Sequence, residues 1–125
     1  MSLEISQGVH DRYAEAEVLQ TQAEIHLAAG RFPAALDRAG LALAIEESLA
    51  DRSKVAKAHQ LRGLAHRGRG ELAEARTDLE AAREIWARTG DAPAVRDTLG
   101  HLAEVYEGLG MAEPAAAARA ERAAG

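Results

Sequence analysis

Histidine is the residue type in this chain that most directly suggests metal or proton chemistry. His59 and His66 stand seven residues apart on a predicted helix, so their Cα atoms are separated by about 10 Å along the helix axis. A zinc ion requires each ligating nitrogen at roughly 2.0–2.1 Å, which makes this pair awkward to bridge. His26 precedes His66 by 40 residues, so the two would occupy the same position in successive structural units. A packed imidazole ring is the role that this position favours. We therefore expect no metal ligands.

Other residue patterns with catalytic potential also favour structural roles. The chain has no cysteine, no HExxH motif, no glycine-rich phosphate loop and no serine in a strand-to-helix turn. Gly68-Arg69-Gly70 is typical of a helix end, while Glu46 and Glu47 are typical of a solvated helix face. We expect no catalytic residue, no cofactor-binding residue, no cofactor and no enzymatic activity. A small helical metal protein or enzyme is the remote alternative.

The composition excludes several further classes of protein. A net charge of −5 and a pI near 5.5 argue against a nucleic-acid partner, which requires a basic face. No apolar stretch approaches the ~20 residues of a membrane span, so we expect no membrane partner. The absence of cysteine agrees with a reducing compartment, and we expect a cytoplasmic protein. Since aromatic residues make up only 3%, the core must consist mainly of aliphatic side chains.

Four series of residues recur with a period of 40 positions. They are Gly30, Gly70 and Gly110; Asp11, Asp51 and Asp91; Ala35, Ala75 and Ala115; and the ring-bearing His26, His66 and Tyr106. A period between 20 and 50 residues is typical of a solenoid. Solenoids present surfaces to partners, so the repeat predicts a binding scaffold.

The same residues divide each period into two helices. Each aspartate can cap the first helix, and each glycine can end it in a left-handed conformation. We predict helices at about 12–29, 33–49, 52–68, 72–88, 92–108 and 112–123. Short connections between them require antiparallel pairs. Residues 1–11 are expected to be a leader, of which the beginning can be a remnant of cloning, and 12–125 a single domain with repeats at about 12–50, 51–90 and 91–125.

The pattern within each period resembles the tetratricopeptide repeat. It places a small residue three positions before a ring, a glycine four after the ring, and an alanine five further on, as in Gly63, His66, Gly70 and Ala75. The usual period of that family is 34 residues. The longer period is similar to the repeats of kinesin light chains, spindle-orientation adaptors and bacterial regulators like the maltose activator. The resemblance implies an all-α, right-handed α-solenoid of three antiparallel hairpins.

Small and aliphatic residues indicate how the predicted hairpins pack. Ala23, Gly63 and Ala103 are small where the two helices of each hairpin should cross. In the last helix, Arg119 and Arg122 occupy places expected to be apolar, so we expect this helix to fray or to need a neighbour. The expected core and inter-hairpin residues are Leu19, Ile25, Leu36, Leu43, Ile45, Leu79, Ile85, Trp86, Leu99, Leu102 and Val105.

The resemblance also implies a binding groove on the concave face of the first helices. Its members would be Glu17, Gln20, Glu24, Leu27, Lys57, Gln60, Leu61, Leu64, Arg67, Asp97, His101, Glu104 and Glu107. Five carboxylates against two basic groups make this set acidic, so we expect a protein or peptide partner with a basic or amphipathic helix. The lysine and asparagine clamp of chaperone-binding relatives is absent, which argues against recognition of a chaperone tail.

Self-assembly is the main alternative to peptide binding. The chain shows no polar capping helix after the last predicted hairpin, whose flank is rich in alanine from Ala115 to Ala118. Such a flank can pack against a second copy, which would make the protein a homo-oligomer.

Overall fold

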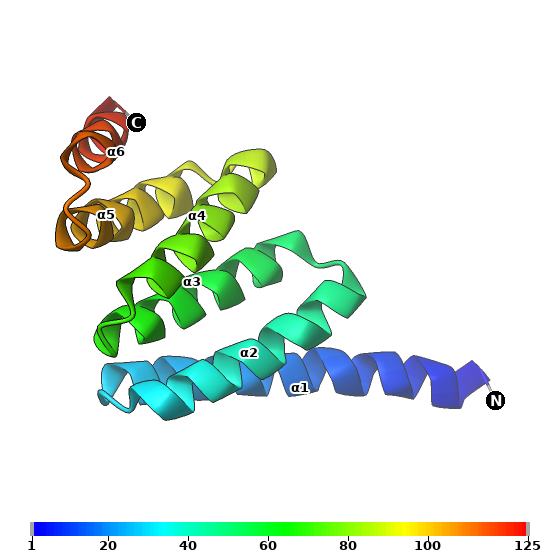
Figure 1. The fold of residues 1–125 in the computed structure, drawn as a ribbon. Coiled ribbons are helices and arrows are strands. Elements are labelled where there is room, and N and C mark those ends of the chain that lie inside the picture. Colours follow the sequence, from blue (N-terminus) through cyan, green and yellow to red (C-terminus); the bar gives the residue numbers. More distant parts are fainter. Residues whose placement is uncertain (1, 125) are drawn as a thin grey trace.

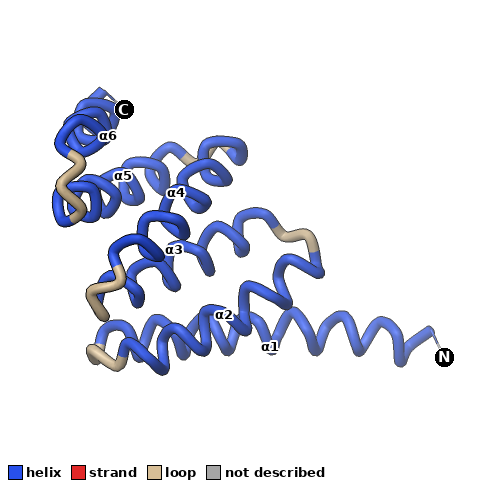
Figure 2. Tube along the Cα trace, in the orientation of Figure 1, coloured by secondary structure: helices blue, strands red, loops and turns tan. Residues whose placement is uncertain are grey.

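The computed structural model describes the backbone of residues 2–124 and the side chains of residues 11–124. Six helices follow one another, joined by short turns: α1 (Ser2–Ala28), α2 (Phe32–Leu49), α3 (Arg52–Gly68), α4 (Leu72–Thr89), α5 (Ala92–Gly108) and α6 (Ala112–Ala124). Figure 1 shows them as three hairpins stacked into an array, and Figure 2 shows that the described chain is helical apart from its turns. The predicted all-α solenoid is confirmed.

The start of α1 differs from the prediction. We expected a helix from about residue 12 with Asp11 as its cap, but α1 already begins at Ser2 and Asp11 lies within it. Residues 2–10, expected to be a leader, continue this helix and extend past α2 (Figure 1). The predicted helix start was wrong because the other two aspartates of the series follow turns, whereas no turn precedes Asp11.

Those other two aspartates cap their helices as predicted. The backbone N–H of Lys54 donates to Asp51 Oδ1 at 3.2 Å, and that of Ala94 donates to Asp91 Oδ1 at 3.1 Å. Each bond satisfies one of the free amides of a first helical turn.

Two kinds of turn join the helices. Within hairpins, the repeating glycines take the left-handed conformation that the sequence predicts, with φ of +79° at Gly70. Between hairpins, Gly90 and Ala50 occupy equivalent places, and Ala50 is left-handed as well, with φ of +57°. An alanine is strained there, because its Cβ crowds the following carbonyl oxygen.

Small residues let the helices of a hairpin approach closely. A Cβ placed on Gly63 of α3 would lie 2.9 Å from Leu79 Cγ of α4, too close without displacing that side chain. Ala75 lies on the facing helix and is fully buried. Larger residues at this crossing would therefore force the two helices apart.

The aliphatic core agrees with the prediction at most positions, but not at Ile25. Leu19, Leu43, Leu79, Trp86, Leu99, Leu102 and Val105 are buried, and Leu36, Ile45 and Ile85 are half-buried. Ile25, which was expected in the core, is 56% exposed. Its equivalent in α5, Val105, is fully buried in a cluster with Ala75 and Leu79 of α4. No helix in the described chain covers Ile25 in the corresponding way.

The last helix, α6, packs on α5 through Ala115 and Ala118, which are buried, whereas Ala116 and Ala117 of the same alanine run are exposed. Its two arginines point to polar partners. Arg119 pairs with Glu107, and Arg122 Nε donates to the carbonyl oxygen of Arg96 at 3.2 Å. The arginines therefore replace the aliphatic contacts that the equivalent residues make in the earlier hairpins.

Candidate functional site

The first helices of the hairpins form one continuous face. The backbone of α3 lies close to the backbones of both α1 and α5. Within residues 2–124, the second helices α2, α4 and α6 do not come this close to one another. The array therefore curves toward α1, α3 and α5. Their exposed sides make up the concave surface on which the sequence places a groove.

The predicted groove residues divide into three groups by exposure. Glu17, Glu24, Asp97, Glu104 and Glu107 are exposed, while Leu27, Lys57, Gln60, Leu64, Arg67 and His101 are half-buried. Gln20 and Leu61 are buried, at 8% and 5% exposure. Leu61 packs with Ala23 and Ala39, so of the three leucines predicted in the groove only Leu27 and Leu64 remain partly exposed.

Ion pairs between helices neutralise much of the expected acidity. Glu17 lies 3.6 Å from Lys54, and Glu24 lies 3.7 Å from Lys57, so both pairs join α1 to α3. Further along the face, Arg67 of α3 pairs with Glu104 of α5. The sequence analysis omitted Lys54, although its place three residues before Lys57 puts both lysines on one side of α3.

Glu107 extends this pattern to the last hairpin, since it pairs with Arg119 of α6. Among the predicted carboxylates, Asp97 alone forms no ion pair with the side chains of residues 11–124. The concave surface is thus a mixed field of both charges rather than an acidic one.

Gln20 has a structural role beneath this surface. Its Nε2 donates to Glu46 Oε2 at 3.0 Å and to the carbonyl oxygen of Lys54 at 2.9 Å, which links α1, α2 and α3. Glu46 is fully buried, and its Oε1 has no hydrogen-bond partner among the described residues. Burial raises the pKa of Glu46 to about 7, although the bond from Gln20 and the charge of Lys54 oppose the rise. Glu46 was expected to be solvated, and that prediction was wrong.

Gln60 joins the next two hairpins from the equivalent place. Its Oε1 accepts from Trp86 Nε1 at 3.3 Å and lies 3.5 Å from Thr98 Oγ1, so it connects α3, α4 and α5. A hollow of about 430 Å³ opens beside it, lined by Lys57, Gln60, Trp86, Asp91, Pro93, Ala94 and Asp97. This hollow brings three of the predicted groove residues together.

Comparison with known proteins agrees with this architecture. A family model described as tetratricopeptide repeat matches residues 54–123, more than half of the chain. The chain belongs to the tetratricopeptide repeat family. Among solved structures, it is similar to the tetratricopeptide repeat domain of Arabidopsis FLU. The two share 21% sequence identity over 90% of this chain and 95% of that one, with a TM-score of 0.85. No curated protein matches the sequence.

Tetratricopeptide repeats generally mediate interactions between proteins and are typically not enzymes. Three helical hairpins whose first helices share one face are the form in which such repeats present a binding surface. None of the described helices is long and apolar enough to cross a membrane.

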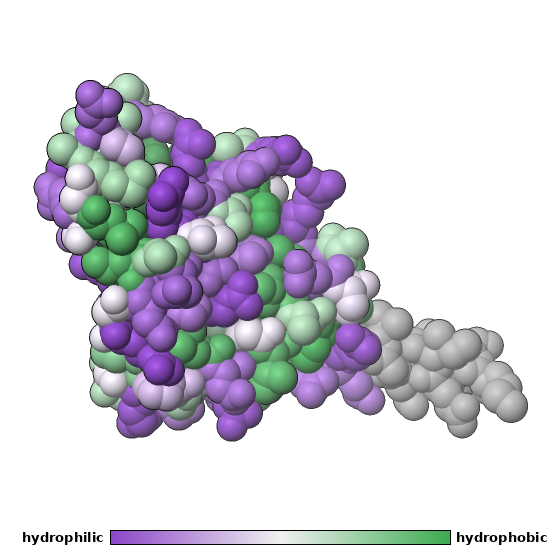
Figure 3. Space-filling view, in the orientation of Figure 1, coloured by the Kyte–Doolittle hydropathy of each residue, from purple (hydrophilic) through white to green (hydrophobic). Residues whose placement is uncertain are grey.

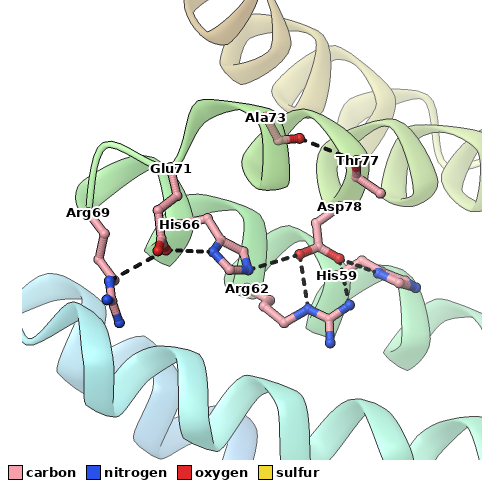
Figure 4. Close-up of polar contacts among 8 residues, drawn as sticks. All are labelled: His59, Arg62, His66, Arg69, Glu71, Ala73, Thr77 and Asp78. Atoms are coloured by element: carbon pink, nitrogen blue, oxygen red, sulfur yellow. Dashed lines mark hydrogen bonds and ion pairs between the residues drawn. The ribbon is translucent and has the colours of Figure 1, made fainter.

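Two histidines of this tetratricopeptide repeat array, His59 and His66, belong to a polar cluster between α3 and α4 (Figure 4). Asp78, which is 3% exposed, lies 2.9 Å from His59 Nδ1 and accepts two hydrogen bonds from Arg62 at 2.8 and 2.9 Å. His66 Nδ1 is 2.9 Å from Glu71, and its Nε2 is 3.8 Å from Asp78. These contacts hold the two helices together.

Electrostatics explains the charge state of the cluster. Burial alone would raise the pKa of Asp78, but hydrogen bonds from His59 and Arg62 outweigh it, so this pKa is lowered overall. The carboxylate is thus charged and fully partnered. Within residues 11–124, no three His, Asp or Glu side chains are arranged to hold a metal ion.

His101 of α5 is the histidine that the sequence analysis assigns to the groove, and it is half-buried. Burial lowers its pKa, an effect that Asp97 opposes through its charge. The ring is therefore neutral at pH 7 and can both donate and accept a hydrogen bond.

Proposed function

We propose that the chain is a protein-binding scaffold whose concave surface, formed by α1, α3 and α5, binds a peptide or helical segment of another protein. The observation that carries the proposal is the hollow between α3, α4 and α5. Lys57, Gln60 and Asp97 offer a cation, an amide and a carboxylate there, while the aliphatic Ala94 lies beside them. Such a set can orient a short segment through polar contacts while burying part of its apolar side.

The charges on the concave surface narrow the class of segment that it can bind. Four of the five predicted carboxylates already have a basic partner in the chain. A uniformly basic segment would have to compete with those partners. An amphipathic segment with both charges could exchange partners without leaving a charge unpaired, so it is the ligand that this surface favours.

The proposal can be tested with helical peptides selected from a random library for binding to the chain. Backbone amide chemical shifts, measured with and without a selected peptide, would locate the binding surface. We expect the perturbed amides to lie on α1, α3 and α5. Peptides that instead perturb only α2, α4 and α6 would overturn the proposal.

Charge reversals provide the second part of this test. Replacing Glu24, Glu104 and Glu107 by lysine should weaken the selected peptides at least tenfold while the helical circular dichroism stays unchanged. The matched control replaces Glu74, Glu84 and Glu113, which are exposed on α4 and α6, and changes the net charge equally. Equal weakening by both triple variants would mean that only bulk charge matters, contrary to the proposal.

A further inference from the structure

The outer side of α1 carries apolar residues whose equivalents are buried elsewhere in the array. Val18 is 55% exposed, but Ala58 and Thr98, at 40 and 80 residues further on, are fully buried. Ile25 is 56% exposed, but Ala65 and Val105 at its equivalent places are fully buried. The repeat itself thus marks this side of α1 as a packing face.

The inner hairpins show what covers such a face. α2 packs on α3, and α4 packs on α5, so the second helix of one hairpin always lies against the first helix of the next. Val105, for example, is buried among residues that include Ala75 and Leu79 of α4. Within the described chain, no helix takes this place on α1.

The exposed face of α1 has the spacing of a helix-packing seam. Alternating steps of four and three residues connect Ala14, Val18, Thr21, Ile25 and Ala28, all of them exposed. Such a 3.5-residue repeat, with β-branched side chains at its three central positions, suits packing against another helix. Residues 11–28 also carry four carboxylates, Asp11, Glu15, Glu17 and Glu24, against the single arginine Arg12.

At the opposite end of the array, no helix of the described chain lies on the last hairpin in the way that α3 lies on the first. In the first hairpin, Ala23 of α1 and Ala39 of α2 cluster with Leu61 of α3, the next first helix. The residues 80 positions further on are Ala103 and Arg119. They line a hollow of about 670 Å³ between α5 and α6, whose full lining is Pro93, Arg96, Asp97, Gly100, Ala103, Glu104, Arg119, Arg122 and Ala123.

Charge at the two ends is complementary. The hollow is lined by three arginines, Arg96, Arg119 and Arg122, against two carboxylates. Arg119 also pairs with Glu107, and the lining carboxylate Glu104 pairs with Arg67. Of the four carboxylates near the seam on α1, Glu17 and Glu24 already pair with lysines of α3, whereas Asp11 and Glu15 are exposed and form no ion pair with the side chains of residues 11–124. The charged residues that line the hollow are exposed. Figure 3 shows that hydrophilic and apolar side chains both reach the visible surface of the molecule.

From these observations we infer that a second copy of the chain occupies the hollow. α1 of one copy lies between α5 and α6 of the next, in the place that α3 takes against α1 and α2. The contact is head to tail, so it uses two different surfaces and can extend to longer assemblies. The hollow shares Asp97 and Glu104 with the proposed concave binding surface, whereas none of the seam residues of α1 belongs to that surface.

Solution mass measured by light scattering after size exclusion, over a range of concentrations at low salt, tests the inference. The wild-type mass should rise with concentration above the 13.3 kDa of one chain. The paired changes Val18→Glu and Ile25→Glu block one surface, and Arg96→Glu with Arg122→Glu block the other, so each double variant should remain a monomer. Leu41→Glu, at an exposed apolar position on α2, is the control and should behave as wild type.

Mixing the two double variants gives the decisive result. Each retains one intact surface, so an equimolar mixture should form a dimer of one copy of each. If the contact were instead two-fold, between two α1 helices, the arginine variant would remain a dimer. Mixing would then produce no new dimer of the two variants, and this result would overturn the inference. A wild-type chain that stays monomeric at all concentrations would overturn it too. Circular dichroism checks that every variant is folded.

Discussion

The two contacts between successive hairpins, here called junctions, have different side chains at equivalent positions. Gln20 and Gln60 occupy equivalent places, as do Glu46 and Trp86, and also Ala50 and Gly90. At the first junction, Gln20 donates to a buried carboxyl group, and the turn is a strained alanine. At the second, Gln60 accepts from a buried indole, and the turn is a glycine.

The difference shows that the repeat fixes where a junction lies but not how strong it is. A buried indole contributes a large apolar area, and its N–H has a partner. A buried carboxyl group has to be desolvated, and one of its oxygens lacks a partner among the described residues. We therefore expect the first junction to be the weaker one, and three predictions test this comparison.

The largest effect is expected from removing the indole at the second junction. Trp86→Ala should lower the free energy of unfolding by about 3–5 kcal/mol, because a large buried ring leaves a cavity. Urea denaturation monitored by circular dichroism measures the change. Trp86→Phe is the control that retains most of the ring volume but removes the bond to Gln60, and it should cost clearly less. If both variants lost equal stability, burial of the ring would not be what makes this junction strong.

The second prediction concerns pH at the first junction. Since burial raises the pKa of Glu46 from 4.5 to about 7, the folded chain keeps a proton that the unfolded chain releases between these values. The stabilisation from this group is complete below about pH 4.5 and is lost as the pH rises to 7. A shift of this size corresponds to roughly 3 kcal/mol.

Glu46→Gln cannot ionise and should lose this pH dependence. The variant should therefore gain stability relative to the wild type as the pH rises from 4.5 to 8. Urea midpoints of both proteins across this range give the difference, in which the titration of all other groups cancels. Parallel curves for the two proteins would show that Glu46 titrates normally.

The smallest effect is expected from exchanging the turn residues. Ala50→Gly should stabilise the chain by about 1 kcal/mol by relieving the left-handed strain, and Gly90→Ala should destabilise it by a similar amount. Ala44→Gly, at an exposed position within α2, is the control and should destabilise the helix. Opposite shifts in thermal midpoint at residues 50 and 90 are the expected result. A loss of stability in Ala50→Gly would refute the strain at this turn.

Much of the fold could be predicted from local signals. Gly30, Gly70 and Gly110 end helices because a left-handed residue is needed there, and Asp51 and Asp91 cap helices because their carboxylates reach nearby amides. The start of α1 could not be predicted from the repeat. Asp11 has the residue type and spacing of a helix cap, but no turn precedes it, so no helix begins there.

The candidate binding surface was less predictable than the fold. The helices that form it follow from the repeat, but the net charge inferred from Glu17 and Glu24 omitted Lys54 and the partner contacts of Lys57. Gln20 was expected on this surface and lies beneath it, bound to Glu46. These assignments depend on which helix lies opposite, and that information is not local in the sequence.

The sequence by itself determined the period, the turns, the caps and the small residues where helices cross, because each of these depends on a few neighbouring residues and recurs. Only the tertiary structure decided which charges pair, why Glu46 is buried without a full set of partners, and why Ile25 is exposed while Val105 is not. The physical reason is that burial and pairing belong to the contact between two hairpins. Identical positions in successive repeats therefore differ according to whether a neighbouring helix covers them.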